Sequence, residues 1–160
     1  MRFRKILVPT DFSANAQLAF NAAYHLARST GAGLDLLHVQ PESDFRIAVK
    51  EELIKRESTE DDLQAAVEEL QDTRFAEVTA GLGPGTPVRC VMVRGATDKS
   101  IIEYALENRA DLMVVGMRGM GAGNKLRTAL LGSVAEAMIR NSPCPVLVVR
   151  PDHDIEQPTA

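Results

Sequence analysis

A glycine-rich loop in the last third of the chain carries the residues whose types and spacing favour chemistry. It follows the apolar run Val114-Val115, passes through Gly116, Arg118, Gly119 and Lys125, and reaches Gly132-Ser133, where an apolar-periodic helix pattern begins. Glycines allow backbone amides to approach a phosphate, a helix start adds unpaired N–H groups and a positive dipole end, and cations supply countercharge. This order of strand, loop and helix start predicts an anion site, and nucleotide binding is the first hypothesis.

The cations of this loop leave two alternatives open. Arg118, Lys125 and Arg127 either contact phosphate or form a solvated basic face, which is the usual position of such side chains. Two better-known glycine motifs are excluded. The chain contains no GxxxxGK[ST] sequence, and the alternating glycines at 119, 121 and 123 lack the spacing of GxGxxG.

The elements that must position this loop alternate between strand and helix patterns. Short apolar runs predict strands at 5–9, 34–39, 88–93, 111–115 and 145–150, and apolar periodicity predicts helices at 14–30, from 97 onward and at 128–140. The charged region 45–79 is helix-prone, either as one helix or as two, and Ser58-Thr59 before Asp61 and Asp62 predicts a helix start inside it. This alternation is typical of an α/β fold with a parallel sheet covered by helices on both faces. We expect one domain over residues 1–151 and a disordered tail over 152–160.

Three strand ends are the expected ligand-binding positions in such a sheet. Ligands bind past the carboxyl ends of parallel strands where the strand order reverses, and this rule selects Pro9-Thr10-Asp11, His38-Val39-Gln40 and the glycine loop. Asp11 could accept hydrogen bonds from ribose hydroxyls or an amino group, or it could cap the next helix. Ser13 can provide that cap, which favours the ligand role for Asp11. Val39 could lie against a purine ring or fill the core, and the residue alone does not decide.

The histidines and cysteines predict no further chemistry. His38 lacks a second metal ligand at suitable spacing and is expected to be a strand-end residue with its hydrogen bonds satisfied. The sequence spacing around His25 and His153 gives no sign of nucleophilic or metal chemistry. Cys90 and Cys144 lie in apolar, strand-like runs without zinc or redox spacing, so we expect both to be reduced core residues.

Charge and composition exclude two kinds of partner. The formal net charge of −4 argues against a nucleic-acid partner, because binding to a phosphate backbone usually needs a basic face. No apolar run approaches the roughly 20 residues that cross a bilayer. The basic residues at the amino terminus lead directly into Ile6-Leu7-Val8 and not into a signal-peptide core. We therefore expect a cytoplasmic protein with no nucleic-acid partner and no membrane partner.

Several motifs in order resemble the universal stress protein family, from about Arg4 to Arg150. They are Ile6-Leu7-Val8-Pro9-Thr10-Asp11-Phe12-Ser13, Leu37-His38-Val39 and the runs 111–116, 131–136 and 142–149. The resemblance implies a doubly wound, five-stranded parallel sheet of order 3-2-1-4-5 with helices on both faces. It also implies a homodimer formed by antiparallel pairing of the last strand, Val146 to Val149. That apolar strand would otherwise leave a sheet edge open to pairing.

One branch of this family binds ATP through the pattern G-x2-G-x9-G-[ST]. The resemblance implies that Gly116, Gly119, Gly132 and Ser133 hold phosphates and ribose, that Asp11 and Val39 contact the adenosine, and that Val115 and Val134 lie nearby. Twelve residues separate Gly119 from Gly132, three more than in the pattern, with the excess around Gly123-Asn124-Lys125. The longer loop either extends the phosphate cradle with Lys125 or swings away from it. Because the pattern glycines, Ser133 and Asp11 are all present, we expect binding to be retained.

These features together predict a stress-response protein that binds adenine nucleotide, ATP or else AMP or ADP, and signals through its bound state. Mg²⁺ could accompany the nucleotide, with the phosphates and Ser133 as its oxygen ligands. The sequence offers no general base or arginine finger beside the loop, so we expect at most slow ATP hydrolysis. The alternative function is a nucleotide-free dimeric interaction module of the same fold, in which the region 45–79 presents a partner surface.

Overall fold

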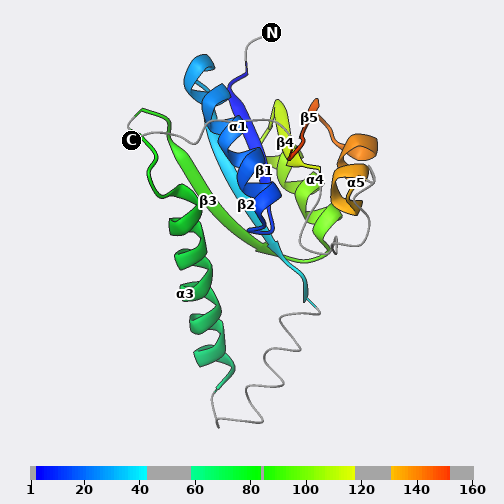
Figure 1. Cartoon of the computed structure of the whole chain (residues 1–160). Coiled ribbons are helices and arrows are strands. Elements are labelled where there is room, and N and C mark those ends of the chain that lie inside the picture. The colour runs from blue at the N-terminus through cyan, green and yellow to red at the C-terminus, as the bar shows by residue number, and fades with distance from the viewer. Residues whose placement is uncertain (1–2, 43–58, 84, 118–130, 152–160) are drawn as a thin grey trace.

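A five-stranded parallel sheet forms the centre of the computed structural model, which describes residues 3–42, 59–83, 85–117 and 131–151. The strands lie in the order β3-β2-β1-β4-β5 (Figure 1). Their bounds are β1 Lys5–Thr10, β2 Gly33–Gln40, β3 Val88–Arg94, β4 Leu112–Gly116 and β5 Val146–Val149. The α/β class expected from the sequence pattern and the order 3-2-1-4-5 implied by the family resemblance are both confirmed.

The parallel register brings the carboxyl ends of the central strands to one edge of the sheet. Thr10 at the end of β1 is level with His38 in β2, and Val39 is level with Val93 in β3. On the other side of β1, Leu7 is level with Met113 in β4. Loops that follow these strands therefore begin close together, as ligand binding at a reversal of strand order requires.

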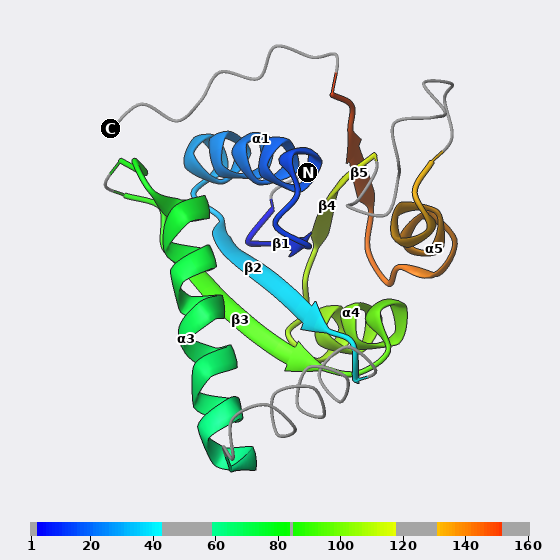
Figure 2. The ribbon, with the colours of Figure 1, turned by 60° about the horizontal axis from the view of Figure 1, so that its bottom comes forward.

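Side chains alternate between two apolar layers, one on each face of the sheet. Ile6 and Val8 pack with helix α1 (Ala14–Thr30), whereas Leu7 packs with α4 (Thr97–Glu107) and α5 (Ser133–Asn141). Figure 2 shows α1 and α4 on opposite sides of the strands. The fourth described helix, α3 (Glu60–Thr79), joins the α1 layer through Phe75 and Val78.

Local sequence signals explain where the described helices begin and end. Ser13 caps α1 as expected, its Oγ accepting from the Ala16 N–H at 3.2 Å, and Gly31 ends that helix at a φ of 72°. Thr59 and Asp62 form a capping box at the start of α3, which confirms the predicted internal helix start. The rest of the helix-prone region, residues 43–58, lies outside the described residues, as do the start predicted near Thr128 and the tail 152–160.

The expectation of core cysteines was wrong. Cys90 is exposed and Cys144 is half-buried, and both are free thiols. Cys90 lies on β3 and Cys144 lies just before β5, and these are the two edge strands of the sheet. Apolar runs at a sheet edge resemble buried strands in sequence, but the helices cover them less completely.

None of the helices in the described ranges is long and apolar enough to span a membrane.

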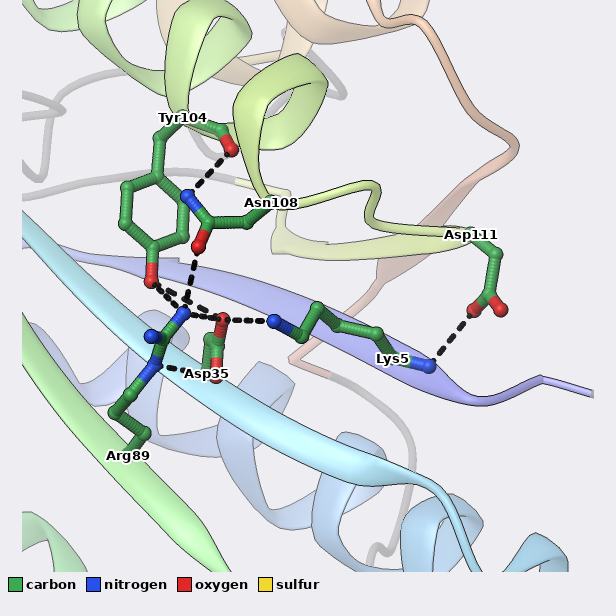
Figure 3. Close-up of polar contacts among 6 residues, drawn as sticks. All are labelled: Lys5, Asp35, Arg89, Tyr104, Asn108 and Asp111. Carbon is green, nitrogen blue, oxygen red and sulfur yellow. Dashed lines mark hydrogen bonds and ion pairs between the residues drawn. The ribbon is translucent and has the colours of Figure 1, made fainter.

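A buried carboxylate, Asp35, fastens the amino-terminal half of the sheet. It lies in β2 and is 4% exposed, and the Arg89 guanidinium of β3 donates to both of its oxygens at 3.1 and 2.7 Å (Figure 3). The Tyr104 hydroxyl of α4 donates to the same carboxylate at 3.1 Å, and Lys5 Nζ of β1 lies 3.5 Å away. These interactions with Asp35 connect β1, β2 and β3 to α4 at the end of the sheet opposite the glycine loop.

Candidate functional site

A cavity of about 710 Å³ lies at the carboxyl ends of β1, β2 and β4. It is lined by eleven of the residues that the sequence singled out: Pro9, Thr10, Asp11, His38, Val39, Gln40, Val115, Gly116, Gly132, Ser133 and Val134. Four further candidates in the glycine loop, Arg118, Gly119, Lys125 and Arg127, lie outside the described residues. The structure therefore brings together side chains from positions more than 100 residues apart in the sequence.

The end of β1 turns sharply at the cavity. Thr10 Oγ1 accepts from the Phe12 N–H at 3.0 Å, and Asp11 Oδ1 accepts from the Ser13 N–H at 3.0 Å. Phe12 has a positive φ of 61°, a conformation that non-glycine residues rarely adopt and that these two hydrogen bonds help to hold. Ser13, and not Asp11, is therefore the cap of α1, whereas Asp11 closes the turn from the cavity wall; its contact with a ligand stays a prediction.

The opposite wall is built from β4 and the start of α5. Gly132 donates its backbone N–H to the Met117 carbonyl at 2.8 Å, which fixes the amino terminus of α5 beside the end of β4. Gly132 is the N-cap and, in the described part of the chain, no side chain caps the helix. Ser133 is the first residue of α5 and Val134 and Ala135 follow it along the cavity wall. First-turn N–H groups and the positive end of the helix dipole favour an anion at this position.

Gly116 is required where this wall meets α1. A Cβ at Gly116 would lie 2.7 Å from the carbonyl oxygen of Asn15 and 3.3 Å from the Ala16 nitrogen, both backbone atoms at the start of α1. Any larger residue would force the end of β4 and the first turn of α1 apart. The glycine therefore serves close packing as well as access to the cavity.

The wall beside β2 is more apolar. Val39 is 6% exposed and lies in the same apolar layer as Leu37 and Ile101, and all three line the cavity. Val39 thus belongs both to the core and to the cavity wall, so the two alternatives raised by the sequence are not exclusive. Thr97, the first residue of α4, also reaches this cavity.

Sequence reasoning missed the contribution of α3, which lines the cavity with Gln71 and Arg74. The Arg74 guanidinium lies 5.5 Å from the centre of the Phe12 ring, a cation–π contact. No motif marks these two residues, because α3 is polar over most of its surface and its docking depends on tertiary packing. The rule that ligands bind past the carboxyl ends of the strands could have predicted Thr97, because this residue opens the helix that follows β3.

His38 is a satisfied strand-end histidine, as predicted. Its Nδ1 lies 2.9 Å from the Thr10 carbonyl oxygen, and its ring centre lies 4.6 Å from that of Phe12. Burial lowers the pKa of His38 below its usual value, and the nearby Arg74 charge acts in the same direction, against the opposing effect of the Thr10 contact. The lowered pKa favours the neutral form of this ring at the cavity wall at neutral pH. The described residues contain no cluster of three or more His, Cys, Asp or Glu side chains suited to a metal ion.

Comparison with known proteins gives the family. The family model described as the universal stress protein family matches residues 2–150. A universal stress protein of Methanocaldococcus jannaschii is 33% identical over 155 residues, covering 92% of this chain and 82% of the relative. The solved structure of a universal stress protein from Lactobacillus plantarum has a TM-score of 0.69 at 26% identity and covers 94% of this chain and 99% of its own.

Two further solved structures of the same fold contain an adenine nucleotide. One is a universal stress protein in complex with cAMP, with a TM-score of 0.61, 23% identity and coverage of 94% of this chain and 98% of its own. The other is a family protein from Arabidopsis thaliana with AMP bound, with a TM-score of 0.55, 20% identity and 94% coverage of both chains. The strand order, the strand-end cavity and the match over nearly the whole sequence agree: this chain belongs to the universal stress protein family.

Proposed function

We propose that the protein binds an adenine nucleotide in the strand-end cavity, with ATP as the first candidate. The observation that carries this proposal is the pairing of two unlike walls in one cavity of about 710 Å³. One wall offers the amino terminus of α5 and Gly116 to phosphates, and the other offers Asp11 to ribose hydroxyls and the apolar surface at Val39 to a purine ring. The family members that contain cAMP and AMP support the nucleotide class.

In this proposal the protein acts in the stress response and lies in the cytoplasm. Its nucleotide-bound state is the form that signals. We expect hydrolysis to be at most slow. Where Mg²⁺ accompanies the nucleotide, the phosphates and Ser133 would supply its oxygen ligands. The residues 118–130, which include the predicted phosphate contacts Arg118, Gly119 and Lys125, are part of the proposal on sequence grounds alone.

A homodimer formed through β5 belongs to the same proposal. β5 is an edge strand, and Leu147 in its middle is 42% exposed, so both its backbone and an apolar side chain are available for pairing. Sedimentation at tens of micromolar should give the mass of two chains. A single-chain mass at that concentration would exclude the dimer without affecting the nucleotide proposal.

Calorimetry on unfolded and refolded protein tests nucleotide binding, because refolding removes any ligand carried through purification. ATP, AMP and cAMP are titrated with and without Mg²⁺ into the wild type, Asp11→Asn and Asp61→Ala. Asp11→Asn keeps an oxygen for the Ser13 N–H but loses the carboxylate, so ATP affinity should fall roughly 10- to 100-fold. Asp61→Ala removes one negative charge from an exposed position on α3 away from the cavity, and should bind as the wild type does.

The absence of heat with all three nucleotides at millimolar concentration would overturn the proposal. A nucleotide-free interaction module would then be the better description of this chain. Equal ATP affinities for Asp11→Asn and the wild type would retain nucleotide binding but remove the ribose contact from Asp11.

A further inference from the structure

Two of the residues that line the cavity have a buried amide oxygen with no hydrogen-bond partner among the described residues. These oxygens are Oε1 of Gln40, the last residue of β2, and Oε1 of Gln71 on α3. Both atoms are buried, and Gln71 as a whole is only 7% exposed. A buried carbonyl oxygen without a donor is unfavourable, and buried polar groups in folded proteins are usually paired. Both oxygens are therefore suited to accept hydrogen bonds from a bound molecule.

The position of Gln71 is set by the docking of α3 on the sheet around Phe75. Phe75, four residues later and on the same helix face, is buried in the apolar layer with β1 and β2. Seven residues earlier, Gln64 accepts a hydrogen bond from Arg94 at the end of β3. The amino-terminal half of α3 projects past the carboxyl end of β3 (Figures 1 and 2). Gln71 is thus held at the level where the strands end and the cavity begins.

The two glutamines lie at the end of the cavity that suits a base. Gln40 directly follows Val39, and the apolar side chains of Val39 and Ile101 line this part of the wall. The anion-binding groups belong to β4 and α5, which lie across β1 from β2 in the sheet order. A nucleotide with its phosphates at Ser133 therefore directs its base toward β2 and α3. Arg74 of α3 also lines the cavity, and its guanidinium lies over the Phe12 ring.

We propose that Gln71, together with Gln40, makes the base end of the cavity selective for a 6-aminopurine, because the two unpaired oxygens accept the two N–H bonds of its exocyclic amine. The proposal rests on the proposed nucleotide function and adds specificity-determining residues to it. Both missing partners are donors, and adenine carries an amine with two N–H bonds at its 6-position. Hypoxanthine carries a carbonyl oxygen at that position, which would leave both glutamine oxygens unpaired and facing a third acceptor.

The test compares ATP with inosine triphosphate, which differs at this end of the base. Calorimetry measures both nucleotides on refolded wild type, Gln71→Leu, Gln40→Leu and the control Gln64→Leu. Leucine is close in size to glutamine but offers no acceptor. Gln64 lies on the same helix as Gln71 but bonds to Arg94 and does not line the cavity, so its substitution controls for changes in α3 itself.

The wild type should bind ATP about 10- to 100-fold more tightly than inosine triphosphate, the range expected when a buried polar site loses its partner. Gln71→Leu and Gln40→Leu should each reduce that ratio at least about fivefold, chiefly by weakening ATP, whereas Gln64→Leu should keep the wild-type ratio. If the wild type binds ATP and both cavity variants keep its ratio, the inference is wrong while nucleotide binding stands. If the wild type binds neither nucleotide, the inference and the proposed function fail together.

Thermal unfolding of the ligand-free proteins separates a structural role of Gln71 from a role in selecting the base. Replacing a buried amide whose oxygen is unpaired with an apolar side chain should leave the melting temperature of Gln71→Leu equal to or above that of the wild type. A clear fall in melting temperature together with an unchanged nucleotide ratio would show that Gln71 stabilises the fold and does not select the base. A structural glutamine would lose stability, whereas a ligand-binding one loses discrimination.

Discussion

Replacing Gly116 with alanine should destabilise the fold, because the added Cβ meets backbone atoms that have little freedom to move. That Cβ would lie 2.7 Å from the Asn15 carbonyl oxygen and 2.9 Å from its carbon, whereas ordinary van der Waals contact begins near 3.4 Å. The start of α1 and the end of β4 must then separate by about 0.7 Å. Overpacking of this kind costs about 1–3 kcal/mol, and we expect a value near the middle of that range because no flexible side chain can yield.

Urea denaturation measures this loss as a lower midpoint with an unchanged slope. A loss of about 2 kcal/mol corresponds to a fall in melting temperature of roughly 4–8 °C for a domain of this size. Gly33→Ala is the matched control, since Gly33 also lies at the end of a strand and its added Cβ would meet only the Arg4 carbonyl oxygen at 3.8 Å. The control should stay within about 0.5 kcal/mol of the wild type. Equal midpoints for the two variants would refute the close packing of α1 against β4.

Three further perturbations test other parts of the fold. Asp35→Ala removes the shared partner of Arg89, Lys5 and Tyr104 and should cost about 2–3 kcal/mol in urea denaturation, below the 3–5 kcal/mol of fully buried pairs because Arg89 is about half exposed and can turn to water. A loss under about 0.5 kcal/mol, as expected for an exposed pair, would contradict the role of the cluster. Gly31→Ala introduces a side chain at a φ of 72° and should cost roughly 1 kcal/mol, whereas no loss in its melting temperature would mean that α1 ends differently. Because burial lowers the pKa of His38 below 6.5, the unfolded chain takes up its proton first, so stability should be full above about pH 6.5 and should fall as the pH drops toward the folded-state pKa. The loss in melting temperature between pH 7.5 and pH 5 should therefore be smaller in His38→Gln than in the wild type, and equal losses would exclude this origin.

The sequence predicts most of the fold because its strands and helices carry local signals. Every predicted strand end lies within one residue of the observed one, since apolar runs bounded by glycine, proline and acidic residues mark buried parallel strands clearly. Ser13 and Thr59 have side chains suited to helix caps and are found in that role. The strand order came from the family resemblance, because local patterns do not reveal which strands are neighbours.

The cavity could be predicted only where strand ends or motifs mark it. Asp11 follows β1, Val39 lies at the end of β2 and Gly132 caps α5, so position in the fold identifies them. Gln71 lies in the middle of a polar helix, and its burial depends on how α3 docks on the sheet, which no spacing in the sequence encodes. The cysteine expectation failed for a related reason. The pattern of Cys90 resembles that of a buried strand, but β3 lies at an edge.

A backbone amide NMR titration with ATP tests the central claim most directly, because it shows where the nucleotide binds on the folded chain. The account predicts saturable shifts for Thr10, Val39, Gly116 and Ser133, which line the cavity on different elements, and little change around Asp35 at the other end of the sheet. Shifts confined to residues away from the strand-end cavity, or no shifts at millimolar ATP, would contradict it.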